Sequence, residues 1–125
     1  MRLPMSKIDP HILGLLEDIY TSAKRIADCL QNETLESFTS QTNLDAQDIV
    51  ARRMTIMGEA ASRLLKKFPE FYEQHPELAL HQARRMRNAL VHDYDRIDWG
   101  LVWKTIHTEL PQLIDAIGPF LSKKG

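Results

Sequence analysis

The segment RNALVHDY, residues 87–94, concentrates side chains that could act on a phosphate. Arg87 carries a fixed positive charge, and its forked N–H donors match phosphate oxygens bidentately. His92 belongs to the residue type that accepts or donates a proton near neutral pH. Asn88 could orient that imidazole or donate to a phosphate, and Tyr94 adds a phenol. The segment therefore combines a cation, a proton shuttle and two further polar groups.

This combination suits the cleavage of an RNA phosphodiester. The histidine would take a proton from a 2′-hydroxyl or give one to the leaving oxygen, and the arginine would stabilise charge on the phosphoryl oxygens. Without a metal, the 2′-hydroxyl must be the nucleophile, which restricts the substrate to RNA. A structural role also fits, with Arg87 in a surface ion pair and His92 at a helix end. Chemistry alone favours the structural role, because chance supplies Arg-x4-His in many proteins.

A basic cluster precedes the motif histidine. Between His81 and His92 stand Arg84, Arg85 and Arg87, with no acidic residue among them. Such clusters are more often solvated faces than binding sites. The formal net charge is only −1, so a contact with nucleic acid would have to come from a local patch of this kind. Arg84 and Arg85 are therefore candidate substrate-binding residues.

The sequence predicts neither a metal nor a cofactor. The run HDYD supplies His92, Asp93 and Asp95, but it lacks the i, i+4 histidine pair or the cysteine set of a zinc site. The other histidines are scattered, and there is no Gly-rich phosphate loop or G-x-S-x-G elbow.

The composition is typical of one globular domain, and we expect a single domain over residues 1–125. Hydrophobic residues make up 43% and charged residues 26% of the 125 residues. No apolar run approaches the ~18 residues that span a bilayer, and the first residues lack the apolar core of a signal peptide. Cys29 is the single cysteine, which fits a reducing cytoplasm and a small buried side chain better than a reactive thiol.

The elements that position the motif are predicted to be helices throughout. N-cap residues and apolar periodicity place them at about residues 10–30, 34–40, 44–67, 76–91 and 98–121. Asp9, Asn43 and Asp98 are the expected caps, and Pro111 predicts a kink in the last helix. Because no period-2 run or hairpin dipeptide occurs, we predict an all-α antiparallel bundle of four to five helices.

Apolar stripes define the expected core faces. Gly58, inside a helix, costs about 1 kcal/mol relative to alanine and so predicts a close helix crossing. The predicted inward residues are Ile12, Leu15, Leu16, Ile19, Ala23, Ile26 and Leu30 in the first helix, Ile49, Ile56, Ala60 and Leu64 with nearby Met57 in the third, and Ala79, Ala83, Met86 and Leu90 in the fourth.

On an ideal helix, the side chains of Arg87 and His92 would point in different directions. On an ideal helix Arg84, Asn88 and His92 form one stripe, whereas Arg87 and His92, five residues apart, point about 140° apart. Arg87 and Tyr94, seven apart, share a direction. Arg87 and His92 can meet at one substrate only if the helix loosens before His92, or if a second copy of the chain completes the site across a two-fold axis.

The pattern Arg87-x4-His92-x-Tyr94 resembles the HEPN family, specifically its HepT-like ribonuclease toxins. The similarity extends over roughly residues 10–120. It includes RN-x3-HDY, the helical turn that begins GEA at residues 58–61, and DW-x3-W-x6-LPQL at residues 98–113. The combination is far more specific than the core motif by itself.

The resemblance implies a helical ribonuclease that works as a homodimer, with a composite cleft at the dimer interface. Arg87 and His92 would be the catalytic pair, with Asn88 as their polar neighbour. Tyr94 would match the tyrosine that a partner nucleotidyltransferase antitoxin can modify with AMP. The expected partners are therefore RNA, a second copy of the chain and a cognate minimal nucleotidyltransferase, with no membrane.

Two other classes of function stay open at this stage. The chain could be a non-catalytic HEPN subunit that binds substrate or nucleotide for a nucleotidyltransferase, or an interaction bundle with no nucleic-acid role. An intact Arg87 and His92 pair favours the enzyme, because neither alternative needs both residues. Trp99, Trp103 and Tyr72 fit core or interface positions better than base-stacking platforms. Glu59 could pair with a motif arginine or be a plain surface carboxylate.

Overall fold

A computed structural model of the chain describes residues 8–91 and 96–122, and this part is helical with no strand. The prediction of an all-α fold is confirmed. None of the helices in these two ranges combines the length and the apolar character needed to cross a bilayer. The elements are α1 (Pro10–Leu30), α2 (Leu35–Thr39), α3 (Leu44–Lys67), α4 (Pro69–Gln74), η2 (Pro76–Leu78), α5 (Leu80–Met86), η3 (Arg87–Leu90) and α6 (Trp99–Ser122).

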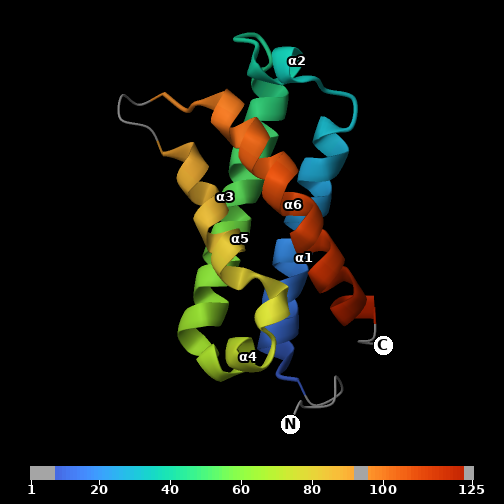
Figure 1. Cartoon of the computed structure of the whole chain (residues 1–125), viewed down its shortest axis with the longest axis vertical. Coiled ribbons are helices and arrows are strands. Elements are labelled where there is room, and N and C mark those ends of the chain that lie inside the picture. Colours follow the sequence, from blue (N-terminus) through green and yellow to red (C-terminus); the bar gives the residue numbers. More distant parts are fainter. Residues whose placement is uncertain (1–7, 92–95, 123–125) are drawn as a thin grey trace.

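Four helical rods run along the long axis of the molecule and alternate in direction (Figure 1). They are α1, α3, α5 with its extension η3, and α6. Helix α3 packs against both α1 and α5, and α6 packs against α1. The short helices α2 and α4 lie at opposite ends of the bundle (Figure 1). The expected antiparallel arrangement therefore holds for the described chain.

The caps predicted for α1 and α6 are present. The Asp9 carboxylate accepts a hydrogen bond from the backbone N–H of His11 at 2.8 Å, and Pro10 occupies the first helical position. That hydrogen bond from the His11 backbone lowers the pKa of the Asp9 carboxyl. At the other end of the chain, the Asp98 carboxylate accepts from the N–H of Leu101 at 3.0 Å. Two aspartates thus satisfy backbone donors that a helix start leaves unpaired.

The predicted side-chain cap at Asn43 is wrong. Asn43 is the N-cap residue of α3, as predicted, but its side chain makes no capping hydrogen bond. Its amide instead donates to the Glu33 carboxylate at 2.6 Å and to the Ser37 carbonyl at 2.8 Å. The Asn43 side chain therefore stabilises the region around α2 and does not bond to the backbone of α3.

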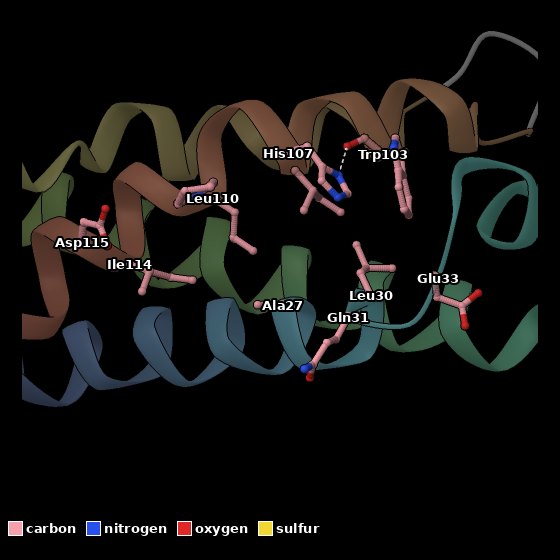
Figure 2. A pocket seen from close by; sticks show the side chains of 11 residues that line it. Ala27, Leu30, Gln31, Glu33, Trp103, His107, Leu110, Ile114 and Asp115 are labelled. Atoms are coloured by element: carbon pink, nitrogen blue, oxygen red, sulfur yellow. Dashed lines mark hydrogen bonds between the residues drawn. The ribbon is translucent and has the colours of Figure 1, made fainter.

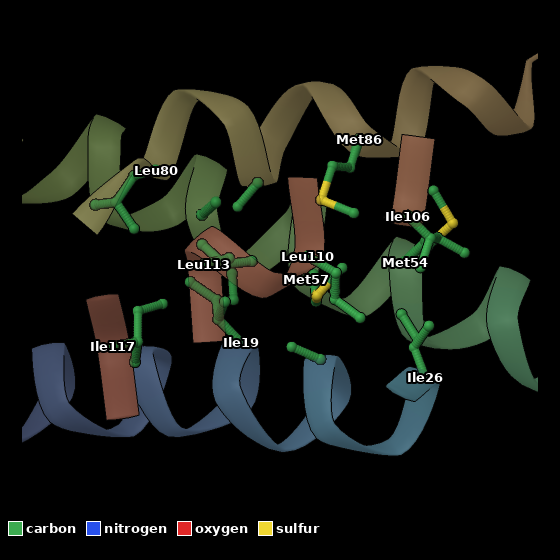
Figure 3. Close-up of a cluster of buried hydrophobic side chains, with 14 of the residues drawn as sticks. Ile19, Ile26, Met54, Met57, Leu80, Met86, Ile106, Leu110, Leu113 and Ile117 are labelled. Atoms are coloured by element: carbon green, nitrogen blue, oxygen red, sulfur yellow. The ribbon is translucent and has the colours of Figure 1, made fainter. Parts of the chain in front are cut away.

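The core lies between α1, α3, α5 and α6, where isoleucine, leucine and methionine side chains interdigitate (Figure 3). The predicted α1 face is buried except for Leu15, which is half-buried. The partly buried Cys29 fits its predicted packing role, because burial, followed by the charge of Glu33, raises the pKa of its thiol. Trp99 and Trp103 both pack against the ring of Phe38, at 5.6 and 5.7 Å between ring centroids.

The predicted inward face of α3 is partly wrong. Ile49 is 44% exposed and Ile56 is half-buried. The sequence of α3 contains two apolar stripes that lie about 100° apart around the helix. Where α3 packs between α1 and α5, it buries the stripe that contains Met54 and Met57. The residues of α3 that are buried on this side without having been predicted are Val50, Met54 and Ala61. The predicted Met57, Ala60 and Leu64 are buried as expected.

The helix predicted over residues 76–91 is interrupted at Ala79. This residue adopts a left-handed conformation, with φ of 56° and ψ of 39°, so α5 begins only at Leu80. From Arg87 to Leu90 the chain tightens from α-helix to 3-10 helix. The tighter turn rotates the following side chains. For this reason Ala89 is buried and Leu90 is only half-buried, contrary to the predicted stripe.

Candidate active site

The close helix crossing predicted at Gly58 is present, and the residue that crosses there is Arg87. A Cβ atom on Gly58 would lie 2.6 Å from Arg87 Cδ and 3.1 Å from both its Cβ and Cγ. Real Cβ atoms essentially never approach within 3.0 Å of another heavy atom. The aliphatic part of Arg87 therefore lies directly on the α3 backbone, and the absence of a side chain at position 58 makes room for it.

The Arg87 side chain lines a pocket of about 820 Å³, which lies between the end of α3, helix α4 and helix α5. This volume falls within the range of about 300–1,000 Å³ that is usual for ligand sites. The polar lining includes Lys66 from α3, Tyr72 from α4, and His81 and Arg84 from α5. Side chains from four elements therefore converge at the residue that the sequence marks as catalytic.

Three of these side chains form a chain of contacts. Arg84 Nη2 lies 3.2 Å from His81 Nδ1. Because a guanidinium can only donate, His81 Nδ1 accepts this hydrogen bond, which assigns the ring proton to Nε2. The His81 ring in turn meets the Tyr72 ring nearly perpendicularly, with 5.0 Å between centroids. The contacts hold α4 against α5 on one side of the pocket.

The pocket is predominantly cationic. Lys66, Arg84 and Arg87 each bring a fixed positive charge, and Glu73 brings a carboxylate to the same lining. Within the residues that the structure describes, neither a hydrogen bond nor a salt bridge holds the Arg87 guanidinium.

The remaining predicted site residues are distributed around this pocket or lie outside the described residues. Arg85 is exposed on α5 and does not line the pocket, and Asn88 is exposed on η3. His92 and Tyr94 lie outside the described residues. Glu59 is exposed, and across the two described ranges it forms no ion pair with Arg87.

Sequence reasoning did not predict Lys66, Tyr72 or His81 as parts of the site. His81 could have been found, because it lies three residues before Arg84 and such pairs meet on a helix surface. Lys66 and Tyr72 carry no such signal, since they reach the pocket only through the chain reversal around α4. Tyr72 packs partly against the core, as predicted, but it also lines the site.

No group of three or more His, Cys, Asp or Glu side chains that could hold a metal ion occurs in residues 8–91 and 96–122. His92, Asp93 and Asp95 lie outside these ranges. The expectation of a metal-free site therefore stays a prediction.

A second pocket, of about 510 Å³, lies between α1 and α6 (Figure 2). Its wall includes Trp103 and His107, whose rings stack with 4.1 Å between centroids. The His107 Nδ1 atom lies 2.8 Å from the Trp103 carbonyl oxygen, to which it donates (Figure 2). Of the predicted site residues that the structure describes, which are Arg84, Arg85, Arg87 and Asn88, none lines this pocket.

The fold and the site define a class: an antiparallel helical bundle that holds a motif arginine in a cationic pocket beside its third rod. Comparison with protein families makes the assignment specific. Residues 19–119 match the family described as "Ribonuclease HepT-like", and the chain belongs to this family. The resemblance seen in the motif is thereby confirmed at the level of the family.

Relatives of similar length carry ribonuclease names. A protein of Thermococcus cleftensis named "Probable ribonuclease HepT" is 31% identical over 98 residues, which cover 78% of this chain and 84% of the relative. A protein of Caldanaerobacter subterraneus subsp. tengcongensis named a "Putative RNase" is 28% identical over 109 residues, which cover 87% of this chain and 93% of the relative. No solved structure matches the chain significantly.

Proposed function

We propose that this protein is a metal-independent endoribonuclease in which Arg87 and His92 act on the scissile phosphate. The observation that carries the proposal is the position of Arg87. It lies against Gly58 and opens into a cationic pocket large enough for part of an RNA strand. Membership of the HepT-like ribonuclease family and the ribonuclease names of the relatives support the same reaction class.

The proposed reaction is attack by the neighbouring 2′-hydroxyl. His92 takes the proton from O2′, which forms a bond to phosphorus while the bond from phosphorus to O5′ breaks. The leaving O5′ takes up a proton, either from an imidazolium or from water. Arg87 stabilises the negative charge that builds on the phosphoryl oxygens. The products are a 2′,3′-cyclic phosphate and a 5′-hydroxyl, so atoms and charge balance without a metal or cofactor.

Nearby polar residues are proposed to bind the substrate. Asn88, which is exposed and stands four residues before His92 in the sequence, orients the imidazole or donates to the phosphate. Arg84, inside the pocket, and Arg85, on the exposed face of α5, contact the RNA backbone. Charge of this kind supplies affinity without reading base sequence.

We further propose that the active unit is a homodimer. Helical geometry ends before His92, because Val91 is extended with φ of −94° and ψ of 133°, so the divergence of about 140° on an ideal helix does not apply across the whole motif. A two-fold axis beside η3 would bring the remaining groups together. Val91, directly after η3, is an apolar side chain that is 75% exposed, which supports an interface at this position.

The proposed biological setting is a toxin–antitoxin pair. A cognate minimal nucleotidyltransferase would neutralise the ribonuclease, either by forming a complex or by attaching AMP to Tyr94. The proposal rests on the motif resemblance and on membership of the family.

Product analysis tests the reaction. The isolated protein is incubated with single-stranded RNA in excess chelator, and the new RNA ends are identified. We expect fragments that end in 2′,3′-cyclic phosphate and begin with a 5′-hydroxyl. Ends with a 5′-phosphate, or loss of activity on chelation, would contradict the proposed chemistry. Complete lack of cleavage, with tight binding of a nucleotidyltransferase, would favour the alternative of a non-catalytic HEPN subunit.

A further inference from the structure

We infer that the pocket beside Arg87 is an RNA subsite for the nucleotide next to the scissile phosphate. In this assignment Lys66 and Arg84 bind the phosphate of that nucleotide, and Tyr72 stacks on its base. The inference rests on the proposed ribonuclease function, because it takes Arg87 as the residue at the cleaved bond. Arg84 is already proposed to contact the RNA backbone, and the subsite adds Lys66, Tyr72 and His81 to it.

The arrangement of the cations suits two consecutive phosphates. Arg84 and Arg87 are three residues apart at the junction of α5 and η3. Side chains with this spacing are neighbours on a helix, with about 5–6 Å between Cβ atoms. Lys66 reaches the same pocket from the last turn of α3. A strand that places one phosphate on Arg87 can therefore place the next one between Arg84 and Lys66.

The orientation of Arg84 is fixed by His81. Contact with His81 Nδ1 at 3.2 Å uses one guanidinium nitrogen, Nη2, and leaves further donors for a phosphate. Restricting the long arginine side chain before RNA arrives reduces the entropy lost on binding. His81 is thus a positioning residue for Arg84 in this subsite.

Tyr72 offers the aromatic group that a base needs. It is half-buried in the pocket lining and is braced by the His81 ring. Stacking on an aromatic ring tolerates every base, because each base has a π-face. The subsite is therefore expected to bind single-stranded RNA with little sequence preference.

Salt dependence separates charge contacts from stacking. Binding of an RNA oligomer carrying 2′-O-methyl groups, which cannot attack the phosphate, is measured over a range of salt concentrations. For single strands the slope of log K against log salt is about −0.7 for each phosphate neutralised. We expect Lys66→Gln and Arg84→Gln each to reduce the magnitude of this slope by about 0.7. Tyr72→Leu should weaken binding about 5- to 100-fold with an unchanged slope, and Tyr72→Phe should bind like the wild type.

The chain supplies matched controls for the charge changes. Lys67 is exposed next to Lys66 but does not line this pocket, and Arg25 is exposed on α1. Lys67→Gln and Arg25→Gln change the net charge equally and should leave the slope unchanged. Glu73→Gln should have the opposite effect on affinity, because it removes the carboxylate from the pocket lining.

The outcomes distinguish the inference from the function on which it rests. Equal slope changes for Lys66→Gln and Lys67→Gln, in folded variants of a protein that cleaves RNA, would overturn the subsite and leave the ribonuclease proposal intact. Slopes that change as expected, in a protein that cleaves no RNA, would retain the subsite and refute the catalytic proposal. His81→Ala should weaken binding more in the wild-type background than in the Arg84→Gln background, where only its contact with the Tyr72 ring remains. An equal loss in both backgrounds would refute its role in positioning Arg84.

Discussion

Gly58 controls where the Arg87 guanidinium can lie. A methyl group at this position would overlap Arg87 Cδ at 2.6 Å, and the flexible arginine stem would have to move. We predict that Gly58→Ala lowers the rate of RNA cleavage about 10- to 100-fold, because small misplacements of catalytic groups cost factors of this size. Stability should change little, since the gain in helix propensity of about 1 kcal/mol offsets the overlap. Cleavage rates and thermal melting measure the two effects.

Gly14 provides the matched control for this substitution. It lies on α1, and a Cβ atom there would meet no other atom within 4 Å. Gly14→Ala should raise the free energy of unfolding by up to about 1 kcal/mol and leave cleavage unchanged. Equal activity in the two variants would show that Gly58 has no role in placing Arg87.

At this scale the sequence predicts the type of constraint but not the contact. Glycine inside an otherwise helical pattern indicates that something approaches closely. Position 58 alone gives no sign that the approaching group is Arg87, 29 residues further along the chain. That contact depends on how α3 and α5 pack against each other. The spacing of residues within one helix gives no information about this packing.

At the scale of elements, Ala79 determines the direction in which α5 leaves the α4 region. Its left-handed backbone costs an L-residue roughly 1–2 kcal/mol, whereas glycine adopts this conformation without strain. We predict that Ala79→Gly raises the free energy of unfolding by about 0.5–1 kcal/mol, after allowing for the greater freedom of glycine in the unfolded chain. Denaturant unfolding measures the change.

An alanine in an ordinary helical conformation serves as the control for Ala79→Gly. Ala116 lies inside α6, where glycine is unfavourable, so Ala116→Gly should lower the stability by about 1 kcal/mol. Destabilisation by both substitutions would contradict the interpretation of Ala79 as a strained connection.

Helix boundaries could be predicted well where side chains act locally. Asp9 and Asp98 cap their helices as expected, because a cap needs only a few neighbouring residues. The break at Ala79 could not be predicted, since alanine is the best helix former and nothing in its type indicates a left-handed turn. The side of α3 that faces the core was also misjudged at Ile49, because two apolar stripes compete and tertiary packing selects one.

At the scale of the whole molecule, the proposed dimer can be tested by complementation. Arg87→Ala and His92→Ala chains are each expected to be inactive as homodimers. If the arginine of one copy works with the histidine of the other, mixed dimers should recover part of the wild-type activity. Sedimentation that shows only monomers at the working concentration, with cleavage intact, would refute the dimer.

Regulation by the proposed antitoxin is tested at Tyr94. Attachment of AMP at the motif would add bulk and negative charge where an RNA phosphate docks, so substrate would be excluded. We predict a mass increase in multiples of AMP after co-expression with the cognate nucleotidyltransferase, and its absence in Tyr94→Phe. Neutralisation of Tyr94→Phe without any adduct on either form would point to inhibition by complex formation instead.

The sequence predicts the family and the residues of the motif, but not the binding pocket around them. Arg87 and Arg84 could be selected because they stand together in an acid-free segment. Lys66 and Tyr72 could not, because three elements must fold before they meet Arg87. The all-α class followed from periodicity alone, whereas the site needed the packing of α3, α4 and α5.

Single-turnover cleavage of RNA by Arg87→Ala and His92→Ala tests whether these two residues are the catalytic pair. Both variants should keep the melting temperature of the wild type within a few degrees. Each should lose at least about 100-fold in cleavage rate, the scale of a general acid–base or electrostatic contribution. If folded Arg87→Ala and His92→Ala proteins, purified free of other nucleases, each keep more than a tenth of the wild-type rate, Arg87 and His92 are not the catalytic residues.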